Sequence, residues 1–223
     1  MTYGAEYKTW AKIDEIITAS LIRPSADLAY LLDACAEEGL PPIEVSHPHG
    51  QFLRLLIAIS GAKRVLEIGT LGGYSAICMA EAVDADGHLI TIEVDPKRAK
   101  LAEKNIHRAG FSDRVTVLCG KALDVLPSIK EAHKELFDLI FIDADKLNNL
   151  SYLKWAIRFA RPGTLIVCDN IIRDMAAPES AGQLASAAEE FVTFMGEHPR
   201  LRSVALQTVG AKGYDGFSLS VVI

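Results

Sequence analysis

Two carboxylates and an amine follow directly after an apolar run in the middle of the chain. Asp143, Asp145 and Lys146 come after Phe137-Asp-Leu-Ile-Phe-Ile142, whose β-branched and aromatic residues predict a strand buried on both faces. In an open α/β sheet, ligands bind beyond the carboxyl ends of the strands, so this cluster is a candidate site. Aspartate is also a good helix cap, and this stretch alone leaves both interpretations open.

A second carboxylate, Asp169, ends the next predicted strand, Thr164-Leu-Ile-Val-Cys-Asp169. Neighbouring strands lie about 4.8 Å apart. Two carboxylates at that spacing repel each other strongly unless a cation lies between them. Oxygen ligands without Cys or His favour a hard ion, Mg²⁺ first, with Mn²⁺ or Ca²⁺ as alternatives. Helix caps without an ion remain the other interpretation.

His47 and His49 show the His-x-His spacing of some metal sites, but no Cys or carboxylate pattern accompanies them. They fall in or beside a predicted loop, Ile43 to Pro48, ahead of an amphipathic helix. Loop histidines are usually solvated, so we expect no metal there.

A glycine-rich segment, Glu67-Ile-Gly-Thr-Leu-Gly-Gly-Tyr-Ser75, follows the first predicted strand and opens a helix. Its G-x-x-G-G spacing differs from the GxGxxG of dinucleotide enzymes, and Glu67 would repel a phosphate. Glu93 ends the next strand, about twenty residues on, where a carboxylate can hold ribose hydroxyls. A bare turn and a solvated strand end are the alternatives. Together, the two features favour a nucleoside with a positive centre and no phosphate, which suggests S-adenosylmethionine.

Strands and helices alternate from Arg64 onward, which predicts right-handed βαβ units, a parallel sheet and an α/β fold. The predicted strands span 64–69, 88–93, 114–119, 137–142, 164–169, 203–209 and 217–222. A helix follows each of the first five strands: 74–83, 96–109, a short helix that ends at 126, 149–160 and 181–197. The last two strands, joined by the turn-rich segment 210–216, should form an antiparallel hairpin at the sheet edge. We expect one domain, with a helical addition over residues 1–42 and a Rossmann-like core over 43–223.

The bulk composition is that of a soluble globular protein. The 223 residues are 50% hydrophobic and 23% charged, with a net charge of −6, which argues against a nucleic-acid partner. No apolar run is long enough to span a membrane and no signal-peptide pattern opens the chain, so we expect a cytoplasmic protein. Cys119 and Cys168 fall in predicted strands, which favours buried free thiols over disulfides.

Four segments together resemble the bacterial cation-dependent O-methyltransferases, relatives of the caffeoyl-CoA and catechol O-methyltransferases. They are Leu66-Glu-Ile-Gly-Thr-Leu-Gly-Gly-Tyr-Ser75, Phe137-Asp-Leu-Ile-Phe-Ile-Asp-Ala-Asp-Lys146, Asp169-Asn170 and Gly213-Tyr-Asp-Gly216. The resemblance runs from about residue 43 to the C-terminus. It implies the class I methyltransferase fold, a seven-stranded, mostly parallel sheet with the last strand antiparallel and helices on both faces. It also implies that the enzyme is a homodimer.

The resemblance further implies which residues bind the cofactor and the cation. S-adenosylmethionine would be bound on its methionine side by Glu67, Gly69, Thr70 and Ser75, at its ribose by Glu93, beside its adenine by Ala122, and also by Val45 and Asp143. The metal ligands would be Asp143, Asp169 and Asn170. Two carboxylates and a neutral amide balance a dication and leave about three coordination positions for substrate and water.

The expected reaction is methyl transfer to a hydroxyl of a phenolic small molecule with a vicinal diol. Asp145, Lys146 and Asn170 would face this substrate. Lys146 is the candidate general base beside Asp143, or else it orients the substrate oxygen through a hydrogen bond; the sequence leaves both roles open. Two other functions also remain open, an NAD(P)-dependent reductase with an atypical glycine loop and a non-catalytic cofactor-binding module.

Overall fold

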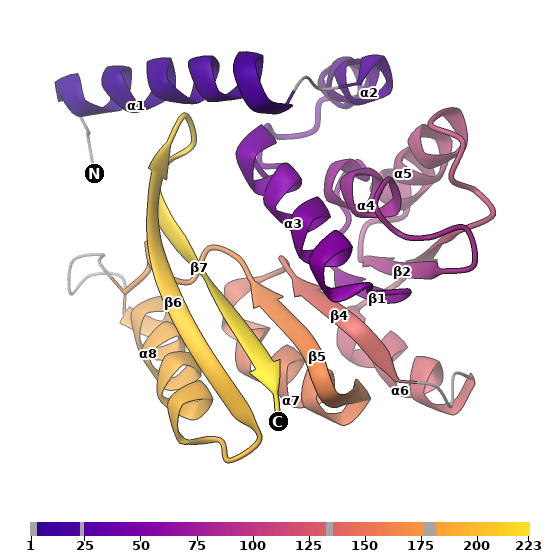
Figure 1. The fold of residues 1–223 in the computed structure, drawn as a ribbon, viewed down its shortest axis with the longest axis vertical. Helices are drawn as coiled ribbons and strands as arrows, with labels where there is room; N and C mark the ends of the chain where they lie inside the picture. The colour runs from indigo at the N-terminus through magenta and orange to yellow at the C-terminus, as the bar shows by residue number, and fades with distance from the viewer. Residues whose placement is uncertain (1–3, 23–24, 133–135, 176–181) are drawn as a thin grey trace.

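The computed structural model describes residues 4–22, 25–132, 136–175 and 182–223, which form one seven-stranded sheet with helices on both faces (Figure 1). Strand order across the sheet is β3-β2-β1-β4-β5-β7-β6. The strands are β1 (Arg64–Ile68), β2 (His88–Glu93), β3 (Val115–Cys119), β4 (Phe137–Ile142), β5 (Ala160–Cys168), β6 (Leu201–Gly210) and β7 (Gly213–Val222).

The helices follow the order that the alternating pattern predicts. They are α1 (Gly4–Ile17), α2 (Ala26–Glu37), α3 (His47–Ser60), α4 (Tyr74–Ala80), α5 (Pro96–Arg108), α6 (Ala122–Ala132), α7 (Asn149–Phe159) and α8 (Gly182–Glu197), with a π-helical turn η1 (Thr18–Ile22) after α1 and a 3-10 turn η2 (Lys146–Asn148) before α7. None of the helices in the described part of the chain is long and apolar enough to cross a membrane.

Strands β1 to β5 run parallel, and β7 pairs antiparallel with both β5 and β6. The predicted topology, with an antiparallel last strand and a hairpin at the edge, is therefore confirmed. Because five parallel strands point the same way, the loops after their carboxyl ends gather along one edge of the sheet. This edge carries most of the residues expected to act in binding and catalysis.

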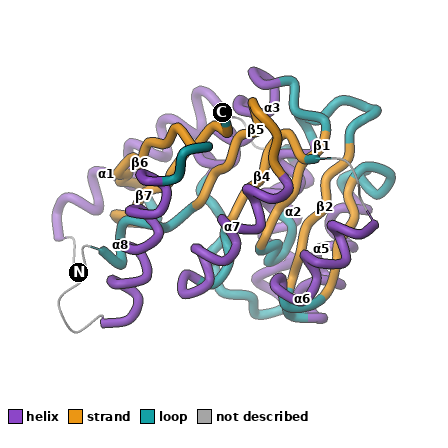
Figure 2. The backbone as a smooth tube through the Cα atoms, turned by 90° about the horizontal axis from the view of Figure 1, so that it is seen from below, coloured by secondary structure: helices purple, strands orange, loops and turns teal. Residues whose placement is uncertain are grey.

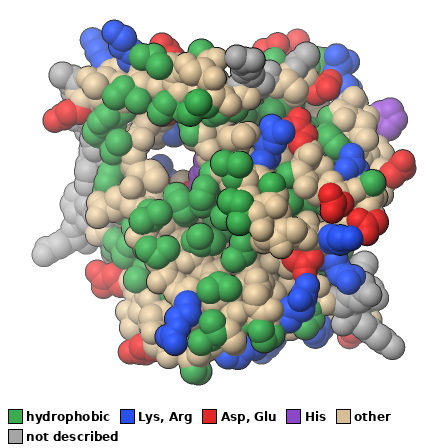
Figure 3. Space-filling model, in the orientation of Figure 1, with side chains coloured by type: hydrophobic (Ala, Val, Ile, Leu, Met, Phe, Trp, Pro, Cys, Tyr) green, Lys and Arg blue, Asp and Glu red, His purple; other side chains and the backbone are tan. Residues whose placement is uncertain are grey.

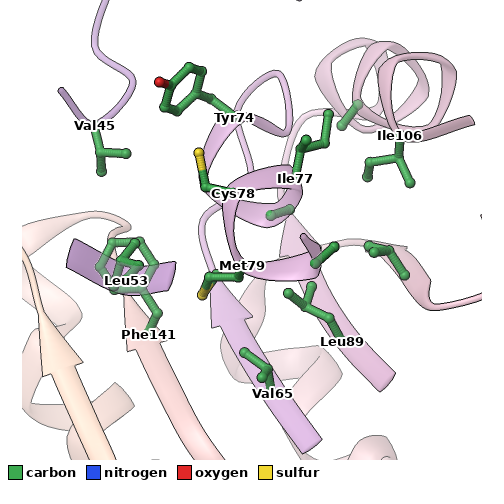
Figure 4. Packing of buried hydrophobic residues seen from close by; sticks show 14 of the residues in the cluster. Val45, Leu53, Val65, Tyr74, Ile77, Cys78, Met79, Leu89, Ile106 and Phe141 are labelled. Atoms are coloured by element: carbon green, nitrogen blue, oxygen red, sulfur yellow. The ribbon is translucent and has the colours of Figure 1, made fainter. Parts of the chain in front are cut away.

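Helices lie on both sides of the sheet (Figure 2). Alternate residues of each central strand enter two separate cores, one on each face of the sheet. Val65 packs with α2, α3, α4 and α5, whereas its neighbour Leu66 packs with α6, α7 and α8. Figure 4 shows the first core, where Leu53 of α3 lies against Phe141 of β4. Burial on both faces explains why the sequences of these strands are continuous apolar runs.

Three expectations from the sequence are wrong in detail. The connection between β6 and β7 is only residues 211–212, so Gly213 and Gly216 lie within β7 and not in a turn. Helix α3 begins at His47, so His47 and His49 occupy its first turn and not a loop. Cys119 is exposed, because it ends β3 at the edge of the sheet, while Cys168 is buried as expected.

Helix α1 lies across the tip of the β6–β7 hairpin (Figure 1). Tyr7 donates its hydroxyl to the Ala211 carbonyl at 2.6 Å, and the Ala211 amide donates to Asp14 at 2.7 Å. The apolar side chains Ile13 and Ile16 of α1 stay about half exposed, at 48% and 57%. Polar contacts thus join the helix to the hairpin, and part of its apolar surface remains uncovered.

Candidate functional site

A cavity of about 830 Å³ lies at the carboxyl ends of β1 to β4. Seven of the eight expected cofactor residues line it, namely Val45, Gly69, Thr70, Ser75, Glu93, Ala122 and Asp143. The eighth, Glu67, is fully buried within β1. Arg98, Asn148 and Tyr152 also line the cavity; no local motif in the sequence marks them.

Glu93 holds the glycine-rich segment in place. One carboxylate oxygen accepts from the amides of Thr70 and Leu71, at 3.3 and 2.8 Å, and the other accepts from the Asp95 amide at 3.0 Å. The oxygen that accepts from Asp95 keeps a second lone pair, whereas both lone pairs of the other oxygen are used. Glu93 is thus both the end of β2 and a structural anchor for the loop that borders the cavity.

Glu67 sits beneath this loop in a buried network of hydroxyl groups. The Thr91 hydroxyl donates to its carboxylate at 2.5 Å and also contacts the Thr70 hydroxyl. Burial raises the pKa of Glu67 to about 8, with Asp143 and Glu93 adding to the rise, although hydrogen bonds from Ser75 and Thr91 oppose it. Glu67 is therefore largely protonated at neutral pH.

Lys146 lies between the ends of β4 and β5. Its amine donates to the Asp143 carboxylate at 2.9 Å and to the Asp169 carbonyl at 3.2 Å. Burial works to lower the pKa of Lys146, but the charges of Asp143 and Asp169, the Cys168 sulfur and the hydrogen bond to Asp143 together outweigh it, and the pKa is raised. Without a cation, Lys146 is therefore an ammonium ion paired with Asp143.

Asp169 is almost fully buried, and both of its carboxylate oxygens have partners. One accepts from the Asn170 amide at 2.8 Å, and the other lies 3.3 Å from Nδ1 of His49. Burial raises the pKa of Asp169, and repulsion by Asp143 raises it further. Asn170 adopts a left-handed conformation with φ of 55°, which is uncommon outside glycine and often marks a functional position.

The donor set suits a hard dication. Within the described residues no group of three or more His, Cys, Asp or Glu side chains is arranged to hold a metal ion. The expected ligands Asp143, Asp169 and Asn170 are two acids and an amide, so they include only two side chains of those four types. Burial raises the pKa of Asp169 most, and the negative charge of Asp143 raises it further against the attraction of Lys146. Oxygen donors with surplus negative charge are the ligands that Mg²⁺ and similar ions prefer.

A second cavity, of about 460 Å³, adjoins the first. His49, Phe52 and Phe217 form its aromatic side, with ring centroids of Phe52 and Phe217 4.9 Å apart. Asn170 and Arg173 line both cavities. Asp14 of α1 lines the second cavity, and Figure 3 shows the molecule hollowed beneath this helix.

Asp145, which we expect to face the substrate, lines the larger cavity together with Lys146 and Asn170. Its two carboxylate oxygens accept from Asn148 and from the Tyr152 hydroxyl, each at 2.5 Å. The acid thus secures η2 and the start of α7 beside Lys146.

The two histidines that the sequence suggested were solvated lie in or beside the site. His47 shares a hydrogen bond of 2.5 Å with the Tyr74 hydroxyl, and His49 is buried against Asp169. Burial lowers the pKa of His49 to about 4, against the opposing attraction of Asp143. The His-x-His spacing was the available signal, but the partner of His49 lies 120 positions away.

Comparisons with known proteins agree with this geometry. The family model for O-methyltransferases matches residues 20–220. A catechol O-methyltransferase from Mycobacterium tuberculosis is 47% identical over 211 residues, 94% of each chain. The crystal structure of an O-methyltransferase from Bacillus cereus in complex with SAH superimposes with a TM-score of 0.94 at 42% identity, covering 97% of this chain and 100% of that one. TomG from Streptomyces achromogenes, solved in complex with SAM, gives 0.92 at 35% identity, covering 97% and 98%.

Proposed function

Because this chain belongs to the O-methyltransferase family, we propose that it transfers a methyl group from S-adenosylmethionine to a catechol-like phenol with the help of a divalent cation. The observation that carries this proposal is the meeting of two cavities at Asn170, beside Asp143 and Asp169. One cavity has room for a nucleoside cofactor, and the other, with its aromatic side, suits a flat phenolic ring. Family membership sets aside the reductase and the non-catalytic binding module.

The larger cavity is proposed to hold the cofactor. Glu93 would bind the ribose through the lone pair left on the oxygen that accepts from Asp95, and Ala122 would lie beside the adenine. Gly69, Thr70, Ser75 and Val45 would enclose the methionine portion, with Glu67 below them. Relatives with SAH or SAM in their crystal structures support this assignment.

Asp143, Asp169 and Asn170 are proposed to hold the cation, Mg²⁺ first, with Mn²⁺ or Ca²⁺ as alternatives. A free phenol has a pKa of about 10, so holding it ionised at pH 7 costs roughly 4 kcal/mol. When bound, the dication supplies positive charge that lowers this pKa by several units. The chain itself contributes the two carboxylates, because Asp143 and Asp169 follow the neighbouring strands β4 and β5 and therefore lie beside the same proposed cation.

Lys146 is proposed to orient the acceptor oxygen as a hydrogen-bond donor, because its ammonium form is favoured beside Asp143. The ionised acceptor oxygen, whose proton has been released to solvent, then forms a bond to the methyl carbon while the carbon–sulfur bond breaks, its electron pair remaining on sulfur. Phe52 and Phe217 would flank the acceptor ring and exclude water from it. If Lys146 acts as a donor, Lys146→Arg keeps part of the activity that Lys146→Met loses, whereas a general base would fail equally in both variants.

Methyl transfer to a panel of catechols and monophenols, with and without Mg²⁺, tests the proposal. We expect catechols to be methylated and monophenols to be poor acceptors, since one hydroxyl cannot chelate a cation. EDTA and the variant Asp169→Ala should each lower kcat/KM by at least about a hundredfold, in line with the loss of a group that acts on developing charge. Full activity of the wild type in EDTA would overturn the role of the cation while leaving the methyl transfer intact.

A further inference from the structure

His49 reaches the proposed cation site from a distant part of the chain. It lies in the first turn of α3, while Asp169 follows β5. Its ring sits among Phe52, Phe141 and Phe217, with centroid distances of 6.0, 6.0 and 5.3 Å. This aromatic surround leaves 14% of the side chain exposed and holds Nδ1 at 3.3 Å from the Asp169 carboxylate.

The surroundings of the ring decide which nitrogen carries the proton. Nε2 is buried and has no hydrogen-bond partner among the described residues. A proton there would be a buried donor without an acceptor, which costs about 1–3 kcal/mol. The oxygens of an ionised Asp169, the form that binds a cation, can only accept, so the proton belongs on Nδ1, which lies 3.3 Å from the nearer of them.

Both Asp169 oxygens thus face a donor: one accepts from the Asn170 amide at 2.8 Å, and the other lies 3.3 Å from Nδ1 of His49. Two donors from different elements fix the plane of the carboxylate, and each oxygen still has a lone pair for another partner. Groups that orient a ligand in this way typically contribute 10- to 100-fold to metal affinity.

We infer that His49 is a positioning residue for the cation, and that its Nδ1–H holds the Asp169 carboxylate in the orientation that binds the ion. The inference rests on the cation dependence proposed above. A purely structural role, in which the ring only fills the aromatic cluster, is the competing explanation.

Two substitutions separate these roles. His49→Phe keeps a ring of similar size in the cluster but removes the donor. His49→Asn gives up the ring but places an amide N–H near the position of Nδ1. His47→Phe serves as the matched control, because His47 lies in the same turn of α3 and bonds to Tyr74 instead of Asp169.

The readout is the affinity for Mn²⁺, measured by electron paramagnetic resonance titration without cofactor or acceptor, together with the affinity for S-adenosylmethionine by calorimetry. We expect His49→Phe to weaken Mn²⁺ binding 10- to 100-fold with cofactor affinity unchanged. His49→Asn should recover a measurable part of the loss, and His47→Phe should stay within about twofold of the wild type.

Wild-type Mn²⁺ affinity in His49→Phe would overturn the inference and leave the proposed function standing. An equal loss in His49→Phe, His49→Asn and His47→Phe, accompanied by weaker cofactor binding, would also overturn it, because it would indicate damage to α3. A wild-type protein that binds no Mn²⁺ and is fully active in EDTA would overturn both the cation dependence and the role of His49.

Discussion

Glu67 is the residue whose charge the fold changes most clearly, because its carboxyl group is fully buried at the end of β1. Its pKa rises from 4.5 to about 8, so the folded protein keeps a proton that the unfolded chain releases. A carboxyl group of this kind contributes stability below pH 4.5, and that contribution is lost as the pH rises toward 8.

We therefore expect Glu67→Gln, without cofactor, to become more stable than the wild type as the pH rises from 4.5 to about 8. The difference should reach a few kcal/mol, or roughly 2–4 °C in Tm for each kcal/mol. Thermal unfolding at pH 5 and pH 8 measures it, with the exposed Glu103→Gln as control. A Tm difference between Glu67→Gln and wild type that is the same at both pH values would show that Glu67 ionises normally in the fold.

Sequence reasoning located some site residues much better than others. Asp143 and Asp169 could be found because each follows an apolar run, and parallel strands bring their carboxyl ends to one edge. His49 could not be placed, because its role depends on how α3 packs against β4, β5 and β7. The charge of Lys146 was equally hidden, since it depends on a balance between burial and the attraction of Asp143.

At the level of elements, the turn after β1 passes so close to the end of β4 that only glycine fits. Gly69 has φ of +101°, and a Cβ atom there would lie 2.0 Å from the Asp143 carbonyl oxygen. Its amide also donates to the Ile92 carbonyl at 3.0 Å, which ties the turn to β2. The glycine thus joins three strands beneath the cofactor cavity.

Gly69→Ala should therefore displace the turn, lower the free energy of unfolding by about 2–4 kcal/mol and weaken S-adenosylmethionine binding at least tenfold. Chemical denaturation and calorimetry provide the two measurements. Gly196→Ala in α8 is the matched control, because no atom lies within 4 Å of its Cβ position, and a helical alanine is favoured by up to about 1 kcal/mol. Equal effects of the two substitutions would contradict the close approach.

Glycine also explains where the sequence misplaced an element. Gly213 and Gly216 resemble turn residues, so the β6–β7 connection was expected over 210–216. Gly216 instead lies inside β7, where a Cβ atom would meet the Leu206 carbonyl and Ile172 at 2.3 Å. Because Gly216 has no side chain, β7 can pack closely against Leu206 and Ile172. The local sequence does not distinguish a glycine required for such packing from a glycine required for a turn.

At the scale of the whole molecule, one face carries a group of exposed apolar side chains, and a contiguous group of this kind often marks an interaction surface. Figure 3 shows apolar side chains gathered over the middle of the face formed by α3, β6 and β7, and along α1. The exposed members include Leu55 and Ile59 of α3 and Val204 and Leu206 of β6, at 49%, 81%, 47% and 48%. Strand β6 also forms an edge of the sheet, and its side chains are exposed on both faces of the sheet. Natural proteins usually cover such an edge strand or place charged residues on it.

We propose that a second copy of the chain covers this face, and we expect light scattering to give a mass about twice 24.2 kDa. Ile59→Lys combined with Leu206→Lys should shift the protein to monomers, because burying two lysines in an apolar interface is costly. Leu184→Lys, in α8 and 37% exposed, is the control that should remain dimeric. A monomeric wild type at micromolar concentration would contradict the proposal, as would a double variant whose dimer dissociates no more readily than that of the control.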